Sequence, residues 1–164
     1  MIEIVEATTE PELAAIRELF VEYREWTLKS LEGAEDAPTF TGHQAEFESL
    51  PGPYAPPGGR LLLGRVEGQP AGCVAYREHA PGEVELKRLY VRPQFRGQKI
   101  GHQLVTTLLE KARAAGAAKV VLSSHANMTS AHAIYRAAGF RDIPAPDDFP
   151  AAQLPLTVFM EREV

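Results

Sequence analysis

The run from residue 83 to 116 constrains the fold most, because a strand, a loop and a helix follow one another in it without interruption. The segment EVELKRLYV (83–91) has the β-branched and aromatic composition of a strand and stops just before Pro93. After the loop, residues 98–115 place apolar side chains at helical spacing and end near Gly116, a common helix terminator. Such an arrangement presents unpaired backbone N–H groups at the positive end of a helix dipole, a geometry that binds phosphate.

The loop itself, RPQFRGQKIG (92–101), has the composition of an anion-binding segment. Gly97 and Gly101 let the backbone approach a ligand closely. Three basic side chains add positive charge: Arg92, Arg96 and Lys99. No Ser or Thr follows the lysine, as a nucleoside-triphosphate loop requires, and the Gly-x-Gly-x-x-Gly spacing of dinucleotide-binding folds is missing. The loop therefore predicts a phosphate or pyrophosphate ligand of another kind.

The rest of the chain alternates between strand and helix signals. Residues 2–7 indicate a strand, and Thr8 or Thr9 can cap a helix that runs to about Lys29 with one apolar face. The other predicted elements are a hairpin of strands 60–68 and 69–79, a strand at 119–124, a helix at 129–138 capped by Thr129 or Ser130, and a last strand at 157–162. The order is strand, helix, linker, three strands, helix, strand, helix, strand, strand, which favours a mixed sheet with helices on both faces.

One segment gives no clear pattern. Residues 31–59 contain several glycines and prolines and include the rigid stretch PGPYAPPGG, so they indicate a connector. The same segment is a natural place for a wall or lid over a substrate, and both interpretations stay open.

Composition bounds the class of protein. The chain of 164 residues suits one domain, since domains most often run ~100 to 150 residues, and we expect a single domain over residues 1–164. The net charge of −5 argues against a nucleic-acid partner, and no apolar run approaches the ~20 residues that span a bilayer. Cys73 is the only cysteine, so neither an internal disulfide nor a cysteine-based metal site is expected. With no secretory signal at the start, we expect a cytoplasmic protein.

Two segments together resemble the signatures of the GCN5-related N-acetyltransferase (GNAT) superfamily. The first signature, Gln/Arg-x-x-Gly-x-Gly/Ala at a strand-to-helix junction, matches residues 96–101, with Lys99 at the place of its middle glycine. The second, a helix with Ala-x-x-x-Tyr that runs into Gly-Phe, matches a set about thirty residues later: Ala131, Tyr135, Gly139 and Phe140. The resemblance covers residues 60–162, and the first strand and helix lie in consistent positions.

The resemblance implies an α/β (α+β) fold with a mixed, mostly antiparallel sheet that splays open between the fourth and fifth strands. Helices flank both faces, and acetyl-CoA lies in the opening as acyl donor, with no metal. The implied pyrophosphate contacts are Arg96, Gly97, Gln98, Lys99, Ile100 and Gly101. The pantetheine arm would bond to the backbone of Leu89, Tyr90 and Val91 like an added strand. The family often has an asparagine seven residues before the tyrosine; Met128 holds that place, so Asn127 is the candidate for its contact.

The resemblance also implies two catalytic roles. Tyr135 would act as the general acid that protonates the leaving thiolate, since a free tyrosine has a pKa of about 10 and holds its proton at neutral pH. Glu85 would remove a proton from the amine, because an ammonium cannot attack a thioester. Glu83 has the same side-chain parity on the strand and is the alternative base.

Each candidate also has an ordinary structural interpretation. Tyr135 alone would be a packing residue, and Glu85 a solvated strand residue. His125 is either an auxiliary base or a solvent-facing loop residue, and Cys73 is either a nucleophile or a small core residue. Three aromatic residues could wall the acceptor pocket or belong to the core or a loop: Tyr23, Trp26 and Tyr54.

We therefore expect an N-acetyltransferase that transfers acetyl from acetyl-CoA to a primary amine of a small molecule or peptide by direct attack on the thioester. The resemblance also implies that the protein can form a homodimer. Two alternatives remain. A catalytically silent acyl-CoA-binding module would use the same loop as a sensor or interaction surface. A phosphate-loop hydrolase would need the Ser or Thr that this loop lacks.

Overall fold

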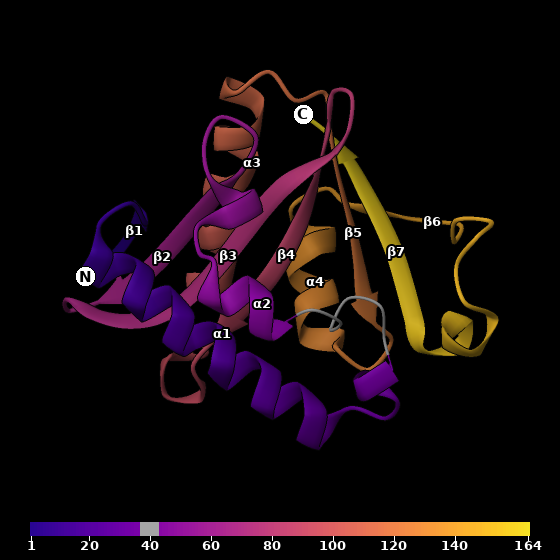
Figure 1. The fold of residues 1–164 in the computed structure, drawn as a ribbon, viewed down its shortest axis with the longest axis horizontal. Coiled ribbons are helices and arrows are strands. Elements are labelled where there is room, and N and C mark those ends of the chain that lie inside the picture. Colours follow the sequence, from indigo (N-terminus) through magenta and orange to yellow (C-terminus); the bar gives the residue numbers. More distant parts are fainter. Residues whose placement is uncertain (37–42) are drawn as a thin grey trace.

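The computed structural model describes residues 1–36 and 43–164 and shows seven strands in one sheet, with helices on both faces (Figure 1). The strands are β1 (Ile2–Glu6), β2 (Arg60–Val66), β3 (Gln69–Ala80), β4 (Glu83–Val91), β5 (Lys119–His125), β6 (Arg141–Ile143) and β7 (Thr157–Glu163). The α-helices are α1 (Glu10–Ser30), α2 (His43–Glu48), α3 (Ile100–Ala114) and α4 (Thr129–Ala137).

The strand order is β1-β2-β3-β4-β5-β7-β6. All neighbouring strands are antiparallel except β4 and β5, which run parallel. The predicted mixed, mostly antiparallel sheet is thus confirmed.

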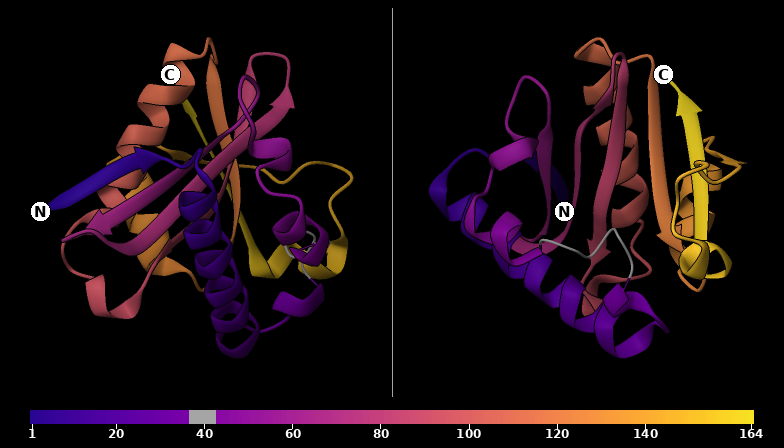
Figure 2. Two further views of the ribbon diagram at one scale, coloured as in Figure 1. Left: turned by 60° about the vertical axis from the view of Figure 1, so that its left-hand side comes forward. Right: turned by 45° about the vertical axis from the view of Figure 1, so that its right-hand side comes forward.

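Two apolar clusters, one on each face, hold the sheet. Helices α1 and α2 cover one face, and α3 and α4 cover the other (Figure 2). Strand β2 shows why this works: Leu61 and Leu63 belong to the cluster under α1, and Leu62 to the cluster under α3. A strand with apolar residues on both sides suits a sheet that is buried on both faces.

Local signals explain where the first helix begins. Thr9 accepts a hydrogen bond from the backbone N–H of Glu12, and the Glu12 carboxylate accepts from the backbone N–H of Thr9, which completes a capping box. The predicted cap and the predicted end near Lys29 are both confirmed, since α1 ends at Ser30.

The start of α4 differs from the prediction. Its N-cap residue is Met128, with no side-chain cap, where Thr129 or Ser130 was expected. The backbone turns into the helix one residue earlier because the N–H of Met128 donates to the carbonyl of His125 at the end of β5.

Strand β4 carries a bulge that matters for the site. Cys73 pairs with Tyr90 and Ala75 pairs with Lys87, so two steps on β3 face three on β4. Arg88 lies inside the bulge with φ +65°, a left-handed conformation. A bulge re-aims the side chains around it, and here the residue inside it, Arg88, is buried.

Candidate active site

The site begins where β4 and β5 part. These strands pair at only three positions, from Glu83–Lys119 to Glu85–Val121, and then diverge (Figure 2). In the described part of the chain, β5 therefore does not pair with residues 89–91, and their backbone groups on that side can bind a ligand. This is the splay that the resemblance implied.

A pocket of about 550 Å³, here called the outer pocket, occupies this opening. Backbone and side chains from β4, the loop after it, α3 and α4 line it. Its walls include most of the predicted ligand residues: Leu89, Tyr90, Val91, Arg96, Gly97, Lys99, Ile100, Gly101 and Asn127. Gln98 is exposed and is not among the lining residues.

A second, much smaller pocket of about 20 Å³, here called the inner pocket, lies deeper between β4 and β5. It shares Tyr23, Leu89 and Met128 with the outer pocket. Both predicted catalytic residues, Glu85 and Tyr135, line it. The two pockets are thus adjacent, with the loop at the outer one and the candidate catalytic groups at the inner one.

The loop presents its backbone to the outer pocket. Gly97 and Lys99 have positive φ values of +85° and +64°, and Lys99 is the N-cap residue of α3 without a side-chain cap. The first N–H groups of the helix therefore point into the pocket mouth with no cap from the protein side. A diphosphate fits such a cradle, because these N–H groups and the helix dipole both favour an anion.

The basic residues of the loop have different partners. Arg96 donates from Nε to the carbonyl of Val91 at 3.0 Å, and its guanidinium lies 5.6 Å from the ring centre of Trp26. Arg92 instead donates to Glu22 at 2.8 Å and to the carbonyl of Pro70 at 2.9 Å. The prediction that Arg92 adds charge to the loop is wrong, because its side chain ties the end of β4 to α1.

Gly101 has a packing reason beyond ligand approach. A Cβ at this position would lie 2.8 Å from Cδ1 of Ile134 on α4. The two helices therefore meet closely at the pocket wall, and a side chain at residue 101 would have to displace the end of the Ile134 side chain.

The loop after β5 is held by His125. Its Nε2 lies 2.6 Å from the carbonyl oxygen of Glu32, and its Nδ1 accepts a hydrogen bond from the backbone N–H of Asn127. With both ring nitrogens engaged and only 5% of the residue exposed, His125 is not a solvent-facing loop residue. Its contacts set the path of the chain into α4.

Tyr135 is buried on α4 and reaches the inner pocket. Burial raises the pKa of its hydroxyl well above the usual value of a tyrosine. Within the described part of the chain, the hydroxyl has no hydrogen-bond partner. Such a group keeps its proton across the physiological range and can offer a hydrogen bond to a ligand.

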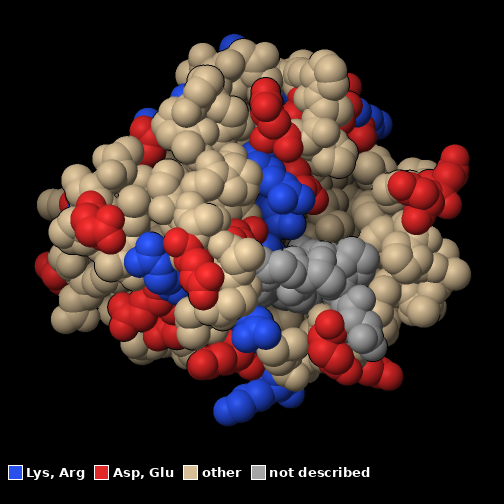
Figure 3. Space-filling view, in the orientation of Figure 1, with Lys and Arg blue, Asp and Glu red and all other residues tan. Residues whose placement is uncertain are grey.

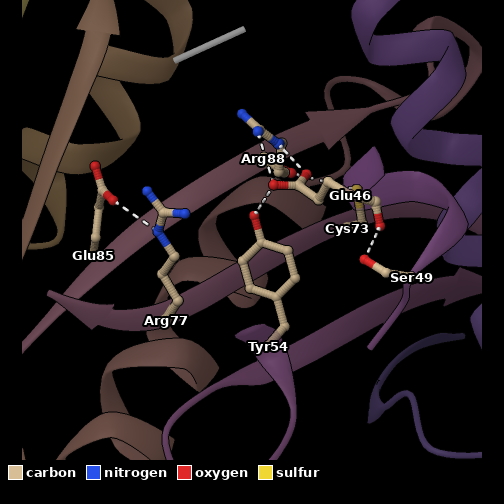
Figure 4. Close-up of polar contacts among 7 residues, drawn as sticks. All are labelled: Glu46, Ser49, Tyr54, Cys73, Arg77, Glu85 and Arg88. Atoms are coloured by element: carbon tan, nitrogen blue, oxygen red, sulfur yellow. Dashed lines mark hydrogen bonds and ion pairs between the residues drawn. The ribbon is translucent and has the colours of Figure 1, made fainter. Parts of the chain in front are cut away.

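Glu85 lies on β4 at the edge of the opening. Its Oε1 accepts from Nε of Arg77 at 3.2 Å, and 17% of its side chain is exposed (Figure 4). Glu83, the alternative base, pairs with Lys119 at 3.0 Å at the closed end of the β4–β5 pair. Glu85 is therefore the better placed of the two carboxylates.

A buried polar cluster that the sequence did not predict lies beside Glu85. Arg88 donates to both carboxylate oxygens of Glu46 on α2, and the Tyr54 hydroxyl donates to the same carboxylate at 2.7 Å (Figure 4). Burial raises the pKa of Glu46, but the hydrogen bonds and charge of Arg88 outweigh it and hold the pKa below its usual value. The residue before Arg88, Lys87, also lines the inner pocket.

The remaining candidates are core residues. Cys73 is fully buried on β3, and this burial raises the pKa of its thiol. The thiol donates a hydrogen bond to the carbonyl of Arg88. Tyr54 belongs to the core under α1. Tyr23 and Trp26 contribute to the same core and also line the outer pocket. No helix in residues 1–36 and 43–164 is both long and apolar enough to cross a membrane.

Known proteins that are similar to this chain identify its family. The model of the acetyltransferase (GNAT) family matches residues 13–140. An uncharacterised N-acetyltransferase of Schizosaccharomyces pombe is 33% identical over 128 residues, which cover 77% of each chain. The IAA acetyltransferase of Azospirillum brasilense is 33% identical over 126 residues, 76% of this chain and 78% of that protein.

Among solved structures, the PaiA N-acetyltransferase of Thermoplasma acidophilum in complex with coenzyme A superposes with a TM-score of 0.77. The match covers 100% of this chain and 99% of that one at 19% identity, which shows the shared fold. Family model, relatives and fold agree, and the chain belongs to the acetyltransferase (GNAT) family.

Proposed function

We propose that this protein is an acetyl-CoA-dependent N-acetyltransferase that acetylates a primary amine by direct attack on the thioester. One observation carries the proposal: the outer pocket, which has a phosphate cradle at its mouth, adjoins an inner pocket lined by a protonated tyrosine and a carboxylate. An acyl donor with a diphosphate at one end and a reactive thioester at the other suits this arrangement.

The donor would be held mainly by backbone. The N–H groups at the start of α3 would bind the diphosphate, and the unpaired edge of β4 at 89–91 would bind the pantetheine arm as an added strand. Asn127 lines the same pocket and would contact the arm from the α4 side. Most of the rate would come from holding the thioester against the amine.

The residues of the inner pocket would move the protons. Glu85 takes one proton from the incoming ammonium, and the neutral nitrogen then attacks the carbonyl carbon, forming the C–N bond. The C–S bond breaks, the sulfur takes its proton from Tyr135, and the second proton released by the nitrogen restores the tyrosine. The products are an amide, the free thiol and one proton from Glu85 to solvent.

Two measurements test the proposal. A thermal melt with acetyl-CoA, free CoA and ATP asks whether the cradle binds its ligand, and ligand at ~100 times its dissociation constant stabilises by about 2.7 kcal/mol. We expect a shift with both CoA species and little with ATP. Thiol release with a panel of amines then asks for turnover.

The competing function is a silent acyl-CoA-binding module, and Lys99 at the place of the motif glycine is the observation that favours it. A silent module would show the CoA shift without thiol release above the rate in water for any amine. The absence of a CoA shift would refute both functions.

A further inference from the structure

The inner pocket contains a buried cation that the proposed mechanism does not use. Lys87 is only 9% exposed and lines this pocket together with Glu85 and Tyr135. It forms no hydrogen bond and no ion pair with any other residue in the described part of the chain. Burial of an unpaired ammonium is unfavourable. An anionic ligand that binds in the inner pocket would supply the negative charge that Lys87 lacks.

The neighbouring charges do not neutralise it. Arg77 pairs with Glu85, and Arg88 pairs with Glu46, so each nearby carboxylate is already matched by an arginine (Figure 4). The local sum over these five side chains is therefore one positive charge. Burial, and next the positive charge of Arg88, lower the pKa of Lys87 to about 8, which still leaves it mostly protonated at neutral pH.

The position of Lys87 on β4 determines the face of the sheet from which its side chain projects. Lys87 and Glu85 are two residues apart on β4, so their side chains project from the same face of the sheet about 7 Å apart. That face is covered by α1 and α2, opposite α3. Viewed from this side, basic side chains reach the surface in a central recess over β4 (Figure 3).

We propose that the acceptor of this enzyme is a small amine that also carries an anionic group of the carboxylate class, and that Lys87 binds this group. The inference rests on the proposed acetyltransferase function and names its acceptor class. The amine would lie at Glu85 and the anion at Lys87, so a separation of about 7 Å or less between the two groups suits short amino acids. The inner pocket, at about 20 Å³, is little larger than the space that one water molecule needs, which favours a small acceptor.

The experiment compares matched acceptors on matched variants. The acceptors are glycine, β-alanine and 4-aminobutyrate, each beside its neutral carboxamide, and the readout is kcat/KM from thiol release. The variants are Lys87→Met, which keeps the length of the side chain and removes the charge, and Lys87→Arg, which keeps the charge. Lys111→Met on α3 makes the same chemical change outside both pockets and serves as control.

We expect the wild type and Lys111→Met to prefer at least one carboxylate acceptor over its amide. In Lys87→Met this preference should fall by about 10- to 100-fold, as for the loss of one buried charge pair, chiefly through the KM of the carboxylate acceptor. Lys87→Arg should keep part of the preference. Because the comparison is a ratio between acceptors, a general loss of activity does not imitate it.

Stability provides a second readout. Lys87→Met should melt at the same temperature as the wild type or higher, since it removes a buried charge without a partner. A structural role would give the opposite pattern, a lower melting temperature with an equal loss for both acceptors of a pair.

The outcomes separate the two levels of the argument. Turnover of amines with no preference for carboxylates, or an equal effect of Lys87→Met on both members of each pair, overturns the acceptor class and leaves the acetyltransferase function standing. CoA binding without turnover of any amine overturns the proposed function and the acceptor class with it.

Discussion

Nε of Arg77 lies 3.2 Å from Oε1 of Glu85, and the two residues are direct partners across the antiparallel β3–β4 pair. Glu85 is also the last residue of β4 that pairs with β5, so its carboxylate sits where the strands begin to diverge. The contact orients the carboxylate through one oxygen. Within residues 1–36 and 43–164, the other oxygen has no partner, and it is the one we expect to accept the proton of the amine.

Glu85→Gln should therefore lower kcat/KM for amine acetylation by about 10²-fold, at the lower end of what general bases contribute. The shape of the side chain and its contact to Arg77 through the amide oxygen are retained. The loss should shrink as the pH rises from 7 to 9, because a growing share of the acceptor is then already a neutral amine. Thiol release measured across this range checks both the size and the pH trend.

Glu83→Gln is the matched control, since Glu83 is on the same strand and face but pairs with Lys119 at the closed end. It should leave kcat/KM within about twofold, as for a surface ion pair. If Glu83→Gln gave the large loss and Glu85→Gln did not, the base would be assigned to the wrong carboxylate.

Tyr135→Phe tests the general acid. We expect kcat to fall by about 10²-fold with the thermal shift by CoA unchanged, because the ring and its packing against Phe140 remain. Since burial raises the pKa of Tyr135, the wild-type rate should show no decline from loss of this proton up to about pH 10.

The control is Tyr76→Phe, which removes another buried hydroxyl that has no hydrogen-bond partner in the described residues and lies outside both pockets. Its kcat should equal that of the wild type. A normal rate in Tyr135→Phe would assign the proton donor to another group.

The sequence predicted most elements because their signals are local. The capping box of α1, the glycine turn of the β2–β3 hairpin and the apolar face of α3 each depend on residues a few positions apart. The two signatures located the loop and α4, and the structure places both at the outer pocket. The cap of α4 was missed because a backbone contact to His125, and no side chain, starts that helix.

The buried cluster could not be predicted for the opposite reason. Arg88 meets Glu46 across 42 positions of sequence, and His125 meets the carbonyl of Glu32 across 93. On a strand, Glu85 and Lys87 look like a solvated face, whereas in the fold Lys87 is buried and Glu85 is half-buried on the face that α1 and α2 cover. One signal was present: the strand EVELKRLYV contains four charged residues, three of them near its centre, which is unusual for a sheet buried on both sides.

The capping box predicts a pH-dependent stability. Backbone N–H groups of Thr8 and Thr9 donate to the carboxylate of Glu12 and lower its pKa from 4.5 to about 2. Because the folded pKa lies below the unfolded one, this stabilisation is complete above pH 4.5 and is lost as the pH falls toward 2.

Glu12→Gln should reduce the free energy of unfolding by about 0.5 to 1 kcal/mol at pH 7, a value kept small because the site is solvent-accessible. The gap to the wild type should close between pH 4.5 and 2, as measured by urea unfolding. Glu10→Gln, in the same helical turn but outside the box, should show little of this dependence. A gap that stays constant with pH would show that the charge of Glu12 is not what stabilises the helix start.

Close packing of α3 on α4 makes a double-mutant prediction. Gly101→Ala should lower the free energy of unfolding by up to about 1 kcal/mol, since its Cβ would meet Cδ1 of Ile134 at 2.8 Å and the end of that side chain must move. Ile134→Val removes that methyl group, so the double variant should recover much of the loss. Urea unfolding of all four proteins gives the coupling energy, and strict additivity would mean that the two side chains do not compete for this space.

The loop should bind CoA through its backbone more than through the side chain that replaces the motif glycine. Lys99 already adopts φ +64°, the left-handed conformation that a glycine would take, so Lys99→Gly preserves the cradle and removes one charge that sits in solvent. We expect its dissociation constant for CoA to stay within about fivefold of the wild type, the size of a surface charge effect.

Gly97→Ala tests the backbone itself. At φ +85° an alanine is strained whatever the space around it, so the loop should shift and weaken CoA binding by about tenfold or more, because several N–H groups lose their alignment together. Isothermal titration with CoA measures both variants. Strong loss in Lys99→Gly with little change in Gly97→Ala would reverse the assignment and make the lysine side chain the principal contact to the diphosphate.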